Sequence, residues 1–223
     1  MNMLAKIKSL ILRIKGMKKH PNPYWIRKYM NFYNYFFIKS NNLKYFKPKN
    51  PDEFQEIVES KKHSRYILDG WLYLCNKLIN MFRKEHDCRD FSFIDVGCGN
   101  GLPLVFVKKK FDFQSVSGFD FIKEVVERSK VNVDRAGLKD INIFIADAKN
   151  FKLDNKKYLL YMFNPFDAEI MNEFMKNNID IMQKTGSVIA YYNQISDELK
   201  VIEKFPYKKI IKDDYYKISI IKY

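Results

Sequence analysis

From Phe91 onward, short apolar runs alternate with segments of helical periodicity. This alternation predicts parallel strands joined by right-handed crossovers, in a sheet covered on both faces. The predicted strands are Phe91–Val96, Ser115–Asp120, Ile141–Ala146, Tyr158–Phe163 and Ser187–Tyr192, and the predicted helices begin near Leu102 or cover Ile122–Ala136 and Ala168–Gln183. The last two runs, Lys209–Lys212 and Tyr215–Tyr223, flank two aspartates and predict a hairpin. The fold class is therefore α/β, with a Rossmann-like, doubly wound sheet.

The loop after the first predicted strand carries glycine at alternate positions, Gly97, Gly99 and Gly101. Glycines at such a turn let a cofactor approach backbone N–H groups. Asp95 precedes the loop, and Asp120 closes the next strand, where a carboxylate can accept both ribose hydroxyls. The spacing G-x-G-x-G differs from the dinucleotide fingerprint, and Asp95 would repel a pyrophosphate but suit an ammonium group. These features disfavour a nicotinamide cofactor.

The motif D-x-G-x-G-x-G and the acids at successive strand ends resemble class I S-adenosylmethionine-dependent methyltransferases over about residues 60–223. The resemblance implies a seven-stranded sheet with an antiparallel terminal hairpin, and S-adenosyl-L-methionine as cofactor. It places the loop residues at the methionine part, Asp120 and Phe121 at the ribose and adenine, and Asp147 and Ala148 near the adenine amino group. The implied cofactor-binding residues in these motifs are Asp95, Gly97, Cys98, Gly99, Gly101, Asp120, Phe121, Asp147 and Ala148.

The fourth predicted strand ends at Asn164-Pro165-Phe166. This motif resembles a subgroup of small bacterial methyltransferases linked to surface polysaccharide modification, which implies cofactor contacts for Asn164 and Pro165. It is also faintly similar to the Asn-Pro-Pro-Tyr motif of amino-group methyltransferases, but the second proline is absent. In the subgroup, the segment before the first strand lies near the cofactor, and here that segment contains His63 and Tyr66. We expect Tyr66 to contact the cofactor.

Methyl transfer depends mainly on alignment of the acceptor with the methyl group, and needs a general base only if the acceptor must lose a proton. The candidate catalytic residues are His63, Asn164, Asp167 and Tyr192. Three of them have ordinary structural alternatives: His63 as a surface histidine, Asp167 as a helix N-cap and Tyr192 as a core residue.

The charge distribution sets the first quarter of the chain apart. The chain has 40 Lys and Arg against 26 Asp and Glu, and residues 1–51 contain 12 of these bases and no acid. Such a segment can attract phosphate, nucleic acid or an anionic membrane, or it can be a solvated arm. Residues 3–19 include a basic amphipathic helical pattern and are a candidate for peripheral membrane contact.

We therefore predict two parts, a basic and aromatic helical cap at residues 1–60 and the cofactor-binding domain at residues 61–223. The cap, through residues 1–46, is expected to cover the carboxyl edge of the sheet and to help select the acceptor. The three cysteines show no metal-ligand spacing, so no metal site is expected, and a reducing cytoplasm fits the sequence.

The predicted function is O-methylation of a small polar or anionic acceptor. A sugar, or a phosphorylated or nucleotide-linked precursor of a surface or capsular polysaccharide, fits this description. One alternative is a nucleic-acid methyltransferase, a less favoured reading that rests on the basic, aromatic N-terminus. The other is a membrane-associated protein that binds the cofactor without catalysis. The expected location is the cytoplasm, with contact to the inner face of the membrane through residues 3–19.

Overall fold

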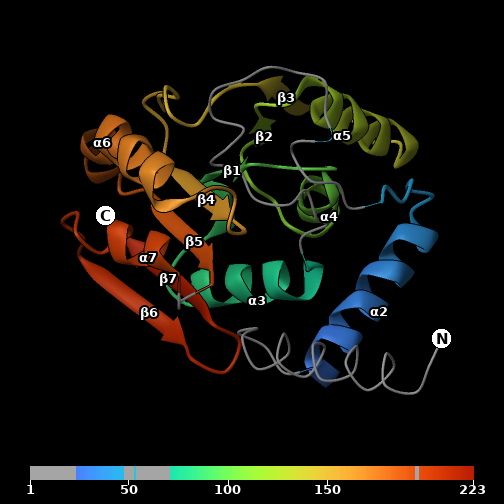
Figure 1. Cartoon of the computed structure of the whole chain (residues 1–223), viewed down its shortest axis with the longest axis horizontal. Helices are drawn as coiled ribbons and strands as arrows, with labels where there is room; N and C mark the ends of the chain where they lie inside the picture. Colours follow the sequence, from blue (N-terminus) through green and yellow to red (C-terminus); the bar gives the residue numbers. More distant parts are fainter. Residues whose placement is uncertain (1–23, 48–52, 54–70, 194–195) are drawn as a thin grey trace, which may run out of the picture.

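The chain folds around one seven-stranded sheet with the strand order β3-β2-β1-β4-β5-β7-β6 (Figure 1). The computed structural model describes residues 24–47, 53, 71–193 and 196–223. Strands β1 to β5 are parallel, whereas β7 runs antiparallel to both β5 and β6. The strands are β1 (Ser92–Val96), β2 (Val116–Asp120), β3 (Ile141–Ile145), β4 (Tyr158–Met162), β5 (Val188–Tyr192), β6 (Lys209–Asp213) and β7 (Ile218–Lys222). The predicted α/β class, the strands and the terminal hairpin are confirmed.

Helices cover the two faces of the sheet unequally. On one face lie α3 (Leu72–Phe82), α4 (Leu102–Lys110) and α5 (Lys123–Arg135), and on the other lie α6 (Ala168–Thr185) and α7 (Asp197–Ile202) (Figure 1). A short 3-10 helix, η3 (Cys88–Asp90), precedes β1. Each face of the sheet has its own hydrophobic core. Side chains along a strand point alternately to the two faces, so Phe93 packs in the core beneath α3, α4 and α5, and Ile94 packs in the core beneath α6 and α7. Burial along their whole length explains why the segments of β1, β4 and β5 read as short apolar runs.

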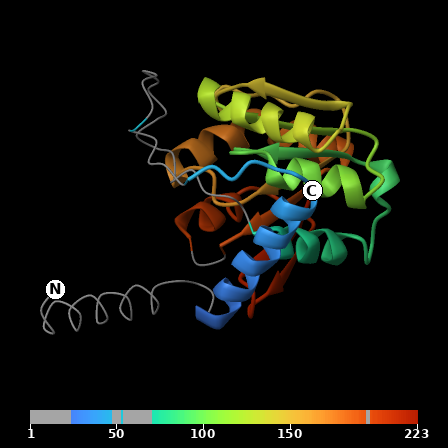
Figure 2. The same ribbon diagram turned by 90° about the vertical axis from the view of Figure 1, so that its right-hand side faces the viewer.

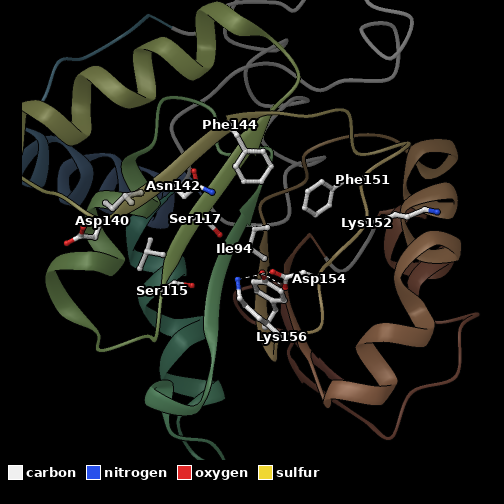
Figure 3. A pocket seen from close by; sticks show the side chains of 13 residues that line it. Ile94, Ser115, Ser117, Asp140, Asn142, Phe144, Phe151, Lys152, Asp154 and Lys156 are labelled. Carbon is white, nitrogen blue, oxygen red and sulfur yellow. Dashed lines mark hydrogen bonds and ion pairs between the residues drawn. The ribbon is translucent and has the colours of Figure 1, made fainter.

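The connection between β3 and β4, residues 146–157, contains no helix. Its Phe151 instead lies on the sheet and stacks on Phe119 of β2, with ring centroids 4.3 Å apart. Beside this ring pair is a cavity of about 590 Å³, which extends along the first residues of β2, β3 and β4 (Figure 3). The cavity therefore lies toward the amino ends of these strands, away from the glycine loop.

Two elements differ from the sequence prediction. Helix α7 was not predicted, because six residues are too few to show a clear helical period; Ser196 begins it by accepting a hydrogen bond from the Leu199 amide at 3.3 Å. The sequence pattern also predicts a helix from about Tyr66 to Arg83, and α3 begins inside that segment, at Leu72. The first residues of the predicted helix lie outside the described residues.

Helix α2 (Tyr24–Ser40) packs against α3 at the outside of the molecule (Figure 2). Its Ile26, Met30 and Ile38 are buried in the same core as α3. The Asn34 Oδ1 atom accepts a hydrogen bond from the Leu72 amide at 3.0 Å and so fixes the start of α3. The predicted boundary between residues 60 and 61 falls outside the described residues. In the part of the chain that is described, no helix is both long and apolar enough to cross a membrane.

Candidate cofactor and acceptor site

The glycine loop joins β1 to α4 at the carboxyl edge of the sheet. Gly97, Gly99 and Gly101 all have positive φ, at 77°, 52° and 76°. A Cβ atom at Gly97 would lie 2.6 Å from the Pro165 Cβ, and one at Gly101 would lie 2.1 Å from the Ser129 Oγ. The loop thus requires glycine both for its backbone conformation and for close packing against the Asn164-Pro165 turn and α5.

Asp95 lies beneath this loop and is only 1% exposed. Its Oδ2 atom has no hydrogen-bond partner among the described residues. Burial, and secondarily the nearby Asp120 carboxylate, raise the pKa of Asp95 well above its ordinary value. A buried carboxyl oxygen without a partner fits a ligand that brings an ammonium group, which is what the methionine end of S-adenosylmethionine carries.

Asp120 closes β2 beside the loop and is 5% exposed. Its Oδ2 accepts a hydrogen bond from the Gly99 amide at 3.3 Å, and its Oδ1 accepts one from the Ile122 amide at 3.2 Å. The carboxylate thus fixes the loop and the start of α5 relative to each other. The following Phe121 packs against Ile122 and Val125.

Asp147 and Ala148 follow the third strand at the same edge. The Asp147 Oδ1 accepts a hydrogen bond from the Lys149 amide at 2.9 Å, so this side chain also stabilises a turn, and Ala148 is buried. Cys98 is buried as well, and burial, with smaller contributions from Asp120 and Asp95, raises the pKa of its thiol well above the ordinary value. The Cys98 side chain therefore stays a neutral thiol.

The ends of β4 and β5 form an aromatic wall on the same edge. The rings of Phe163 and Tyr192 stack with centroids 4.4 Å apart and planes at 7°. Trp71 meets both rings edge-on, with centroid distances of 5.9 Å to Phe163 and 6.0 Å to Tyr192. Tyr192 is thus buried and packed among other rings, as the core alternative in the sequence analysis expects, and its candidate catalytic role stays a prediction.

Two asparagines directly follow this aromatic wall. Asn164 lies two residues after the end of β4 and Asn193 directly follows β5, and these two strands are neighbours that pair Met162 with Tyr191. Both have positive φ, 51° and 87°, and the Oδ1 atom of each is buried without a hydrogen-bond partner among the described residues. Asn193 was missed in the sequence analysis, although its place after a strand end matches that of Asn164. The pair offers two carbonyl oxygens to a ligand that donates hydrogen bonds.

The remaining candidate residues fall into two groups. The Asp167 Oδ1 accepts hydrogen bonds from the Glu169 amide at 3.1 Å and the Ile170 amide at 3.2 Å, which makes Asp167 the N-cap of α6. His63 and Tyr66 lie outside the described residues. Within those residues, no cluster of three or more His, Cys, Asp or Glu side chains is arranged to hold a metal ion.

One side chain connects the end of the N-terminal segment to the glycine loop. The Asn132 Oδ1 accepts a hydrogen bond from the Lys44 amide at 2.8 Å, and the Asn132 Nδ2 donates to the Asn100 carbonyl oxygen at 2.9 Å. Arg128 lies over the Phe46 ring at 5.1 Å. The segment after α2 is therefore fixed to α5 next to the loop.

Comparisons with known proteins assign a class to this arrangement. Residues 93–186 match a family described as "Methyltransferase domain". Human EEF1A lysine methyltransferase 2 is 24% identical over 153 residues, which are 60% of this chain and 64% of that protein. The probable cobalt-precorrin-6B C(15)-methyltransferase (decarboxylating) of Methanococcus vannielii is 27% identical over 128 residues, covering 53% of this chain and 69% of that protein. The chain thus spans less than two thirds of the human relative.

Solved structures show the same fold. An RNA methyltransferase from Salinibacter ruber in complex with S-adenosyl-L-homocysteine aligns with a TM-score of 0.52 at 8% identity, over 70% of this chain and 92% of that one. A variant of MtNAS in complex with S-adenosylmethionine aligns with a TM-score of 0.51 at 12% identity, over 68% of this chain and 61% of that one. None of these four proteins is described as modifying a polysaccharide, so that narrower resemblance stays a prediction.

Proposed function

Residues 93–186 form a class I S-adenosylmethionine-dependent methyltransferase domain, and from this premise we propose that the chain transfers a methyl group to a polar acceptor held at the ends of β4 and β5. When bound, S-adenosylmethionine supplies an electrophilic methyl carbon on a sulfonium sulfur. The expectations of a methyltransferase and of this cofactor are confirmed at the level of the domain. The acceptor and the roles of individual residues are proposals.

In the proposed complex, Asp95 pairs with the ammonium group of the methionine part, because its buried Oδ2 atom has no hydrogen-bond partner in the part of the chain that the structure describes. The backbone of the glycine loop lies along the methionine part, Asp120 faces the ribose, and Asp147 with Ala148 lies near the adenine. Pro165 packs on Gly97 and so joins the cofactor loop to the turn that carries Asn164. This contact sets the distance between the cofactor and the acceptor.

The observation that supports the acceptor site is the Asn164 Oδ1, a buried carbonyl oxygen next to the aromatic wall that has no hydrogen-bond partner among the described residues. Leaving such an oxygen unpaired costs about 1–3 kcal/mol, so a hydroxyl or amine that donates a hydrogen bond to it is favoured. The donated hydrogen bond orients the acceptor lone pair, while the Phe163, Tyr192 and Trp71 rings exclude water. A hydroxylated ring such as a sugar suits this combination, because its hydroxyl groups donate to carbonyl oxygens and its C–H groups pack on an apolar wall.

The resulting reaction is an O-methylation of a small polar acceptor, with sugars and phosphorylated or nucleotide-linked sugars as the first class to test. With the cofactor bound, the acceptor oxygen would form a bond to the methyl carbon as the carbon–sulfur bond breaks, and the hydroxyl proton would pass to a general base, a role for which His63 is a candidate. A second candidate is an amino group, which can donate to Asn164 equally well. The likeness to a protein named as a lysine methyltransferase favours it.

The test is incubation of the full chain with S-adenosylmethionine carrying a labelled methyl group, in separate reactions with sugar nucleotides, lysine peptides and RNA, read by mass spectrometry. We expect label in the sugar fraction. Label in the peptide fraction would select the amino-group candidate, and label in RNA would select the nucleic-acid alternative. No transfer to any fraction, together with tight cofactor binding, would support the non-catalytic alternative.

The Asn164→Ala variant tests the acceptor site itself. It should lower kcat by about 10²-fold, the effect of removing one well-placed hydrogen-bonding group, while cofactor affinity changes little. Asn193→Ala is the matched comparison on the neighbouring strand and should raise KM more than it lowers kcat. Full activity of Asn164→Ala would exclude the proposed acceptor site.

A further inference from the structure

Helix α2 exposes a continuous row of large aromatic side chains. Trp25, Tyr29, Phe32, Tyr35 and Phe36, the α2 aromatic face, are 62%, 50%, 60%, 54% and 53% exposed. The opposite side of the helix is buried against α3. Soluble proteins seldom expose so many large apolar groups together unless the surface binds something.

The charge on this helix has one sign. The α2 sequence contains Arg27, Lys28 and Lys39 and no acid, and residues 41–47 add Lys44 and Lys47 without an acid. The Lys28 Nζ lies 4.8 Å from the Tyr24 ring centroid, and the Lys39 Nζ lies 5.9 Å from that of Tyr35. Lys39 is therefore beside the aromatic face, and Lys28 is beside the neighbouring Tyr24 ring, so both can reach an anionic surface that the rings contact.

The arrangement of the rings favours a membrane over single-stranded nucleic acid as the binding partner of this face. Bases stack on aromatic faces that stand open. Here Phe32 meets Phe36 edge-on with centroids 4.4 Å apart, and Tyr35 meets Phe36 at 89° with centroids 5.8 Å apart. Phe32, Tyr35 and Phe36 therefore cluster with one another. Tyr29 packs edge-on against Tyr73 of α3 with centroids 5.2 Å apart. Rings packed in this way suit insertion of an apolar surface into an interface rather than stacking of separate bases.

We propose that the α2 aromatic face docks the protein on an anionic lipid bilayer, with α2 lying in the plane of the interface. Phe32 and Phe36 would enter the boundary between headgroups and acyl chains, the Trp and Tyr rings would lie at headgroup level, and the lysines would contact lipid phosphates. This proposal concerns residues 24–40, not the residues 3–19 considered in the sequence analysis. It is independent of the proposed function.

Docking at this position would bring the acceptor end of the domain close to the membrane. The Trp71 Nε1 donates a hydrogen bond to the Asn31 Oδ1 of α2 at 2.8 Å, and the Trp71 ring belongs to the aromatic wall. The helix that would contact lipid is therefore one hydrogen bond from the proposed acceptor site.

The first experiment is flotation of the full chain with vesicles of phosphatidylcholine and phosphatidylglycerol, and with vesicles of phosphatidylcholine alone. We expect binding to the anionic vesicles and a loss of about tenfold or more in the partition coefficient for the double variant F32S/F36S. The matched control replaces two exposed apolar residues elsewhere, I145S and V131S, which are 53% and 41% exposed. The control should bind like the unchanged protein.

The second experiment reports on α2 directly, so contact through other segments cannot imitate the result. In the W71F variant, Trp25 is the only tryptophan of the chain. Its fluorescence should shift to the blue and be quenched by brominated acyl chains in anionic vesicles. Unchanged vesicle binding of F32S/F36S, or a Trp25 that brominated lipid does not quench, would overturn the proposal. So would binding of a single-stranded RNA oligonucleotide that depends on Phe32 and Phe36 while vesicles do not bind.

Discussion

At the scale of single residues, position 101 requires glycine for two separate reasons, its backbone conformation and its close contact with Ser129. Its φ is 76°, and an added Cβ would lie 2.1 Å from the Ser129 Oγ and 3.1 Å from the Ser129 Cα. Gly137 has a similar φ of 67° with nothing within 4 Å of an added Cβ, so it serves as a control for the backbone cost alone. Gly101→Ala should therefore cost about 1–3 kcal/mol more in the free energy of unfolding than Gly137→Ala, measured by urea denaturation. Equal losses would show that Ser129 moves aside without cost.

The burial of Asp95 predicts how the stability of the folded protein changes with pH. The pKa of Asp95 is raised in the folded protein, first by burial and then by Asp120, so the folded state binds its proton more tightly than the unfolded chain does. The stabilisation from this group is fully present below the ordinary Asp pKa of about 3.9 and is lost as pH rises through the raised pKa. We expect Asp95→Asn to remove that loss and to be at least as stable as the unchanged, cofactor-free protein at neutral pH. A steeper fall of stability with pH in the variant would contradict this.

The same carboxyl group should link cofactor binding to a proton. An ammonium group placed beside Asp95 favours the ionised carboxylate, so at a pH below the raised pKa the proton is released on binding. Calorimetry of S-adenosylmethionine binding in buffers of different ionisation enthalpy measures this release, and Asp95→Asn should abolish it. The sequence predicted the residue from its motif position, but not its protonation, which depends on burial beside an acid 25 positions later.

At the scale of elements, variants of Asp167 can distinguish its role as the N-cap of α6 from a role as catalytic base. Asn is an N-cap of similar strength, whereas Ala is not. Asp167→Asn should therefore keep both the stability and the activity, and Asp167→Ala should lose about 0.5–2 kcal/mol in the free energy of unfolding. If Asp167→Asn folds normally but loses methyl transfer, the carboxylate is the base and its capping role is secondary.

The elements also show where sequence patterns are sufficient. Strands β1, β4 and β5 could be predicted because they are buried along their whole length, and such a strand is a short apolar run between turn residues. Helix α7 could not, since its six residues depend on the Ser196 cap and on packing against α6. The aromatic density of α2 indicated a helix, but rings surround that helix on all sides. Which of them face solvent is decided by the contact with α3, a segment more than 30 residues further along.

At the scale of the whole molecule, the cap and the domain share one core. Ile26, Met30, Ile38 and Leu43 are 0–7% exposed within the core that includes α3. Burying each such side chain contributes about 1.5–3 kcal/mol, so the four together approach the whole stability of a typical domain, about 5–15 kcal/mol. Deletion of residues 1–46 should therefore abolish cooperative unfolding rather than leave a folded cofactor-binding domain. Circular dichroism during heating measures the cooperativity of unfolding. A cooperative transition in the truncated protein would show that the domain folds without residues 1–46.

The position of the site could be predicted at this scale, because the carboxyl ends of parallel strands meet at one edge of the sheet. Asp95, Asp120 and Asp147 lie there as expected. Only some residues of the proposed acceptor site could be predicted from the sequence. Trp71 and Asn193 are more than 120 residues apart, and only the sheet register and the ring contacts bring their neighbourhoods together.

The Asn132 amide group links the segment after α2 to the glycine loop, and this link can couple binding at the two places. The two hydrogen bonds of Asn132 leave the Lys44 amide and the Asn100 carbonyl with one shared partner. Coupling between two binding events is reciprocal, so the cofactor and a lipid surface that steadies the α2 segment would each strengthen the binding of the other by the same free energy. The fraction of the protein bound to the membrane would then depend on the supply of methyl donor.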